Sequence, residues 1–137
     1  MCPLIDRIDI VVEVPALEFE ELRIRKPAEK SEDIKKRVNA ARHTQRQHFE
    51  STGFDCNARM EQKQLREFCE LTEDGEALMK MAFEKMGLTA RSYDRILRVA
   101  RTIADLDGAD SISPNHLAEA IQYRTYDFRE PGGEIQE

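Results

Sequence analysis

Residues 88–108 read LTARSYDRILRVARTIADLDG, and this stretch decides the fold that the rest of the chain is expected to adopt. Its apolar side chains recur at steps of three and four residues, which places them on one face of a helix. Gly108 follows as a stop signal, because glycine readily adopts the left-handed conformation that ends helices. The pattern predicts a helix from about Ala90 to Asp107, with a buried stripe of Tyr93, Ile96, Leu97, Ala100, Ile103 and Ala104.

Two further helices are predicted in the part of the chain that precedes this helix. The longer one begins at Ser31, a residue type that often caps helices, and ends before Gly53. Its apolar stripe consists of Ile34, Val38, Ala41 and Phe49. After a loop, a short helix is expected around Glu61 to Glu70, with Leu65, Phe68 and Cys69 facing inward.

Two more helices flank the central one directly. Thr72 caps a helix that ends at Gly87, and its apolar positions are Leu78, Met81, Ala82 and Met86. Pro114, directly after Ser113, favours the first turn of a last helix. That helix reaches about Asp127 and carries Leu117, Ala118, Ile121 and Tyr123. Because several apolar stripes can bury one another, the sequence predicts an all-α helical bundle over residues 31–128.

The N-terminal residues follow a different pattern. Ile8 to Val14 is β-branched and mostly apolar, as in a strand buried within a sheet, and Pro15 ends the run. No second convincing strand follows, so the expected partners of this strand would lie in a core that precedes Met1. We therefore expect no well-formed sheet strand here, an irregular connector up to residue 30, and a disordered tail over residues 129–137.

Composition narrows the class of protein. The 137 residues carry a formal net charge of −6, which argues against a stand-alone nucleic-acid binder but leaves room for a local basic stripe. Cys2, Cys56 and Cys69 form neither a disulfide framework nor a zinc motif, which is typical of reduced thiols in the cytosol. Neither a secretion signal nor a membrane-spanning run is visible, so we expect a cytoplasmic protein without membrane contact.

Arginines are the residues most able to carry chemistry. Arg91 lies in the first turn of the central helix, where backbone N–H groups and the helix dipole attract phosphate; local pairing with Asp94 or plain solvation are the alternatives. Arg95, Arg98 and Arg101 follow at three-residue spacing along one flank. This basic row could meet nucleic acid, carboxylates of a partner, or only water.

Other kinds of site are not indicated. His43, His48 and His116 have no spaced partners, so no metal site is predicted. The sequence holds no GxxxxGK[ST] loop, so this chain does not itself cradle a nucleotide, and we expect it to bind no cofactor alone.

Several phrases resemble one family in family order. They are LIDRIDI at residues 4–10, VEVP at 12–15, NARM at 57–60, the central stretch up to residue 106, and HLAEAIQYR at 116–124. Together they resemble the C-terminal region of the magnesium chelatase subunit I-like family, and most closely its ComM/YifB-type branch of AAA+ ATPases. The resemblance spans residues 3–124.

The resemblance implies a role for the chain within a larger ATPase. Residues 1–30 would be the last strand of an ATPase core and a connector, and residues 31–128 the helical lid over ATP and Mg²⁺. Arg7 matches the family's arginine finger, which acts on the nucleotide of a neighbouring subunit. Arg91 matches sensor 2, which contacts the γ-phosphate. The resemblance further implies a hexameric ring. In the ComM/YifB-type branch of the family, this ring would translocate along DNA and drive branch migration in recombination or DNA uptake.

Two alternatives remain at this point. A magnesium chelatase subunit would share the same lid, and DNA-stimulated ATP hydrolysis would argue against it. A stand-alone helical interaction module would explain the bundle, but it would not explain the isolated strand or Arg7.

Overall fold

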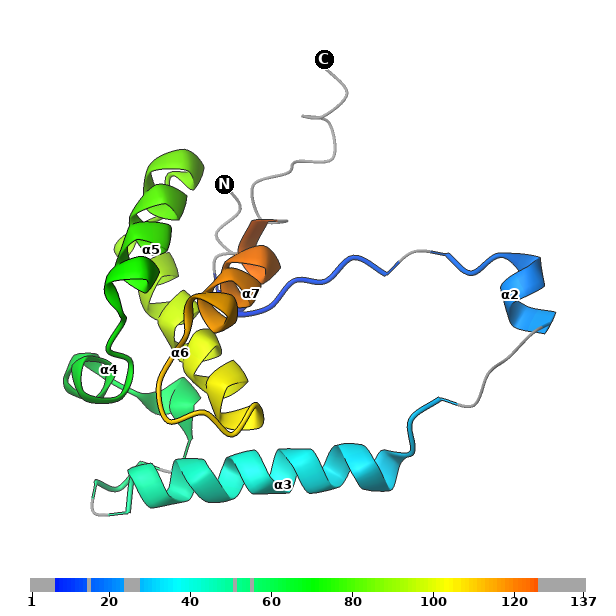
Figure 1. The fold of residues 1–137 in the computed structure, drawn as a ribbon, viewed down its shortest axis with the longest axis horizontal. Helices are drawn as coiled ribbons and strands as arrows, with labels where there is room; N and C mark the ends of the chain where they lie inside the picture. Colours follow the sequence, from blue (N-terminus) through cyan, green and yellow to red (C-terminus); the bar gives the residue numbers. More distant parts are fainter. Residues whose placement is uncertain (1–6, 15, 24–27, 51, 55, 126–137) are drawn as a thin grey trace.

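The computed structural model describes residues 7–14, 16–23, 28–50, 52–54 and 56–125, and these residues form an all-α bundle (Figure 1). The elements, in chain order, are α2 (Phe19–Arg23), α3 (Ser31–His48), the 3-10 turn η1 (Asn57–Arg59), α4 (Gln62–Phe68), α5 (Glu73–Met86), α6 (Ala90–Leu106) and α7 (Pro114–Thr125). No strand occurs in the described part of the chain. The predicted fold class is therefore confirmed.

Helix α6 lies at the centre of the bundle and contacts α7, α3, α4 and η1. Ile96, Leu97, Ala100 and Ala104 of its predicted stripe are buried, and Tyr93 and Ile103 are half-buried. Thr89 caps the helix, because its side-chain oxygen accepts a hydrogen bond from the Ser92 N–H. The sequence pattern thus located both the helix and its core face.

Helices α5 and α7 pack against each other beside α6. Thr72 caps α5 as predicted, and Gly87 ends it in the left-handed conformation with φ 62°. An isolated parallel β-bridge between Leu71 and Ile112 joins the loops that precede these two helices. The individual core positions were predicted less well, because Met81 and Ala118 are exposed while Met79 and Ala120 are buried.

Helix α3 packs on the described bundle through its C-terminal half, where Ala41 and Gln45 are buried. There the ring of Phe49 meets that of Phe68 edge to face, with centroids 5.2 Å apart, and His48 stacks on Phe68 at the same separation. Ile34 and Val38, which the sequence placed in the core, are 43% and 45% exposed, so that prediction was wrong. The N-terminal half of α3 extends beyond the elements that could cover it (Figure 1).

The helix boundary at Ser31 was predicted correctly, but its capping was not. Ser31 is the first helical residue, and Lys30 occupies the N-cap position without a side-chain hydrogen bond. The acidic side chains of Glu32 and Asp33 lie in the first turn, where they suit the positive end of the helix dipole.

The N-terminal segment does not form the strand that its β-branched pattern indicates. Residues 7–14 have no sheet partner among the residues that the structure describes, and Val12 and Val14 are exposed. The expectation that Ile8 to Val14 would lack a sheet is therefore confirmed. Helix α2, which buries no residue, lies apart from the bundle (Figure 1). The predicted tail, 129–137, lies outside the described residues.

Candidate functional site

The first turn of α6 presents the arginine that the sequence singled out. Arg91 is exposed there, while the next residue, Ser92, is fully buried. The hydroxyl of Thr89 accepts the Ser92 N–H at 3.2 Å and donates to the Ser92 hydroxyl at 3.2 Å. These bonds fix the turn, so Arg91 projects from a rigid helix start whose dipole favours anions.

Arg124, near the end of α7, is the residue at this site that sequence reasoning missed. Its side chain is 0% exposed, although arginine is rarely buried unless it is paired. One terminal nitrogen donates to the backbone oxygen of Ile8, and the other donates to the Ser92 hydroxyl at 3.4 Å. A single guanidinium therefore bridges the residue after Arg7 and the residue after Arg91.

Residues 7–12, here termed the N-terminal strap, lie against α6 and α7 through further contacts. The carboxylate of Asp9 forms an ion pair with Arg95 on α6. The backbone N–H of Val11 donates to the backbone oxygen of Tyr123 on α7 at 3.2 Å. A cavity of about 260 Å³ lies beneath, lined by Asp9 and Ile10 of the strap and by side chains of α6 and α7. Arg7 is exposed at the start of the strap.

The predicted basic row on α6 does not form one surface. Arg95 pairs with the strap, and Arg98 is half-buried and donates two hydrogen bonds, at 3.1 and 2.8 Å, to the Met60 oxygen. Arg101 is 2% exposed. A guanidinium held inside the bundle is not accessible to nucleic acid or to a partner protein. The structure therefore contradicts the prediction of such a contact for Arg101.

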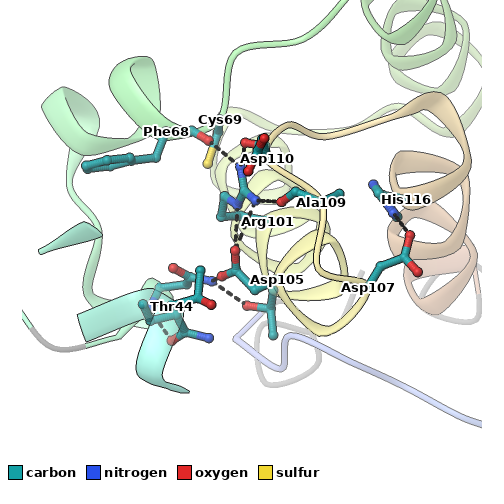
Figure 2. Close-up of polar contacts among 12 residues, drawn as sticks. Thr44, Phe68, Cys69, Arg101, Asp105, Asp107, Ala109, Asp110 and His116 are labelled. Atoms are coloured by element: carbon teal, nitrogen blue, oxygen red, sulfur yellow. Dashed lines mark hydrogen bonds and ion pairs between the residues drawn. The ribbon is translucent and has the colours of Figure 1, made fainter. Parts of the chain in front are cut away.

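Arg101 instead organises a buried polar network (Figure 2). It bonds the Asp105 carboxylate, with nitrogen–oxygen distances of 3.1 and 3.0 Å. It also donates to the backbone oxygens of Phe68, Ala109 and Asp110 at 2.9 to 3.2 Å. The guanidinium thus fastens the end of α4 and the α6–α7 loop to the central helix.

Asn57 extends this network to α3. Its side-chain nitrogen donates to Asp105 at 2.8 Å and to Thr102 at 3.0 Å. Its backbone N–H donates to the side-chain oxygen of Gln45 on α3 at 3.1 Å. The NARM segment at residues 57–60 is therefore a structural junction between α3 and α6.

Comparison with known proteins identifies the family. The model of the family described as "Magnesium chelatase, subunit ChlI C-terminal" matches residues 28–124, which is most of the chain. This chain belongs to that family. The resemblance inferred from the sequence is thereby confirmed.

Several relatives match nearly the whole chain. It is 36% identical to the uncharacterized protein YifB of Escherichia coli over 126 residues, which are 91% of this chain and 24% of YifB. It is 37% identical to the competence protein ComM of Haemophilus influenzae over 123 residues, 89% of this chain and 23% of ComM. An uncharacterized protein of Mycobacterium tuberculosis, Rv2897c, is 30% identical over 122 residues, or 89% of the chain and 24% of its own length. The chain thus spans about a quarter of the length of these relatives.

Within this member of the ChlI C-terminal family, a histidine reinforces the α6–α7 loop. The backbone N–H of Ser113 donates to Nδ1 of His116 at 3.0 Å, while Nε2 lies 2.8 Å from the Asp107 carboxylate (Figure 2). The His116 backbone N–H donates to the Ser113 hydroxyl at 3.4 Å, so the two residues form a reciprocal cap on α7. The arrangement brings Ser113, His116 and Asp107 together, but both ring nitrogens of His116 are used in structural contacts, one with the Ser113 N–H and one with the Asp107 carboxylate.

Neither a reactive buried thiol nor a metal cluster is indicated in the described part of the chain. Burial raises the pKa of Cys69 to about 12, although nearby Arg101 opposes the shift. No three His, Cys, Asp or Glu side chains gather closely enough among the described residues to hold a metal ion. None of the helices in that part of the chain combines the length and apolar character needed to cross a membrane.

Proposed function

We propose that this chain is the helical lid region of an AAA+ ATPase, in which Arg91 senses ATP and Arg7 acts on a neighbouring subunit. Family membership over residues 28–124 supports the proposal, because the chain corresponds to about a quarter of much longer relatives. The observation that carries it is the exposed Arg91 on a capped helix start, beside a strap that carries Arg7.

The donor chemistry of Arg91 fits a phosphate group. A guanidinium offers a planar fork of N–H donors that matches phosphate oxygens, and the start of α6 adds a favourable dipole. When bound, ATP with Mg²⁺ supplies the phosphoryl group whose transfer to water releases free energy. Arg91 would bind the γ-phosphate and orient the lid over it. Loss of that phosphate would remove the partner of Arg91 and let the lid move.

Arg7 would act in trans. An exposed arginine at the edge of the lid can reach a nucleotide that an adjacent subunit holds, which requires a ring; we propose a hexamer of the longer protein. Positive charge near the transferring phosphoryl group stabilises the negative charge of the transition state. Arginine fingers that are supplied from outside the nucleotide-binding core raise turnover by roughly 10³–10⁵.

The work that this ATPase performs is proposed from its relatives. ComM is named as a competence protein, which favours DNA translocation or branch migration during DNA uptake or recombination. The second candidate is a magnesium chelatase ATPase subunit, which the description of the family model favours. If DNA is the partner, exposed arginines of the lid would bind it, because Arg101 is buried.

The test uses the longer protein that contains this segment. Arg91→Ala and Arg7→Ala should each lower the ATP turnover rate by at least about 10³-fold, because each removes a positive charge that stabilises the phosphoryl group during transfer. Arg46→Ala on α3, at an exposed position, is the matched control and should leave turnover in the absence of DNA unchanged. The same substitutions in the 137-residue chain should leave its circular dichroism unaltered, which shows that each variant still folds. Wild-type turnover in both arginine variants would refute these roles.

A second measurement separates the two candidate activities. Turnover of ATP by the longer protein is measured with and without single-stranded and branched DNA. Stimulation by DNA supports the DNA motor. No response to any DNA, together with stimulation by a porphyrin and Mg²⁺, would support the chelatase instead.

A further inference from the structure

The two arginines of the proposed function are connected through one side chain. Arg7 precedes Ile8, whose backbone oxygen accepts from Arg124, and Arg91 precedes Ser92, whose hydroxyl accepts from the same guanidinium. No intervening residue is needed, because both acceptors bond to the two terminal nitrogens of a rigid planar group. The spacing of the two backbone segments is therefore set by Arg124.

This connection is held more firmly than a surface contact would be. Arg124 is fully buried, so weakening its hydrogen bonds to Ile8 and Ser92 would reduce the compensation for a desolvated cation inside the bundle. The Asp9–Arg95 ion pair and the bond from the Val11 N–H to Tyr123 attach the strap at two further points. Three attachments along residues 8–11 prevent the strap from pivoting about any one of them.

We infer that Arg124 is a positioning residue that couples Arg7 to Arg91, so that the strap moves with α6 as one body. The inference rests on the proposed function for its consequence. If Arg91 follows the γ-phosphate of its own subunit, the rotation of α6 is passed through Arg124 to Arg7, which serves the nucleotide of the neighbour. One buried guanidinium would thus connect successive ATP sites around a ring.

The attachment itself is tested in the 137-residue chain by amide hydrogen exchange. In the wild type, the Val11 amide should be protected because it donates to Tyr123. Arg124→Lys keeps the charge but offers a point donor that cannot bridge both acceptors, so Val11 exchange should rise about five- to tenfold. Amides in the middle of α6, such as that of Ala100, should keep wild-type protection. Unchanged Val11 exchange in this variant would overturn the inference.

A second pair of variants keeps the test decisive if Arg124→Lys fails to fold. Asp9→Asn removes only the ion pair with Arg95, and it lies at an exposed position. It should also accelerate Val11 exchange, and the charge-swapped Asp9→Lys/Arg95→Glu chain should restore protection. If Asp9→Asn leaves Val11 protected, or the swap restores nothing, the strap is not attached as the structure indicates and the inference fails.

The coupling is tested in the longer ATPase with a readout that a merely structural role would not move. Arg124→Lys should lower kcat about 10- to 100-fold and reduce the cooperativity between ATP sites, while KM for ATP changes less than about twofold. If Arg7→Ala and Arg91→Ala abolish turnover but Arg124→Lys retains wild-type kcat and cooperativity, the coupling is refuted and the proposed function stands. If Arg7→Ala and Arg91→Ala leave turnover unchanged, the proposed function fails, whatever the exchange data show for the strap.

Discussion

Replacement of Arg101 by methionine provides a sharp test of the polar network at the centre of the bundle. Arg101→Met removes the donor for four acceptors, the Asp105 carboxylate and the backbone oxygens of Phe68, Ala109 and Asp110. The side chain of Asp105 is 0% exposed, so its charge would remain in the interior without its cation. Removing one partner of a buried ion pair typically costs about 3–5 kcal/mol.

That cost is large compared with the stability of a domain of this size, which is typically 5–15 kcal/mol. With a urea slope of about 1–3 kcal/mol per molar, the midpoint of unfolding should fall by roughly 2 M. The measurement is equilibrium urea unfolding at pH 7, followed by circular dichroism at 222 nm. Arg46→Met on α3 is the control, because Arg46 is exposed and its loss should change stability by less than about 0.5 kcal/mol.

A double variant separates the ion pair from the packing. In Arg101→Met/Asp105→Leu no buried charge is left from the pair, so its destabilisation should be smaller than the sum of the two single variants by about 0.5–3 kcal/mol. If the destabilisation of the double variant equals the sum of the two single variants, the ion pair does not account for the cost of Arg101→Met. An Arg101→Met chain whose stability equals that of Arg46→Met would refute the reasoning.

Three further outcomes are expected. Because the pKa of Cys69 is raised to about 12, only roughly 10⁻⁴ of its thiol is ionised at pH 8. Iodoacetamide should therefore modify the half-buried Cys56 far sooner than Cys69 in the native chain. Equal rates for the two thiols in peptide mass mapping would contradict the burial of Cys69. Thr89→Ala should lower the unfolding free energy by about 1 kcal/mol through loss of the α6 cap, whereas Thr89→Ser should retain most of it; urea midpoints decide. Gly87→Ala should cost about 1 kcal/mol because φ is 62° there, and Gly87→Asn should cost less; equal midpoints for both would contradict the strain.

The local elements were predictable because their signals lie within a few residues of one another. The stripe of α6, the cap at Thr72 and the stop at Gly87 all depend on short-range periodicity and backbone preference. The family was also recognisable from short phrases, and comparison with known proteins confirmed it.

Predictions that depended on which faces are covered were less successful. Ile34 and Val38 have the spacing of a core stripe, yet the described bundle does not bury them, and they are 43% and 45% exposed. Arg101 belongs by spacing to the same row as Arg95 and Arg98, but the α6–α7 loop closes over it with two carbonyl oxygens. Helical periodicity gives the direction of a side chain but does not reveal which segment lies there.

The sequence by itself determined the helices, the absence of a phosphate loop, and the two arginines at the strap and at the start of α6. Only the tertiary structure decided that Arg124 joins those two segments and that Arg101 is an internal fastener. The physical reason is distance along the chain. Ile8 and Arg124 are 116 residues apart, and no local preference encodes a contact over that separation. Such contacts form only when the chain packs in three dimensions, because burial then favours polar groups that find partners from distant segments.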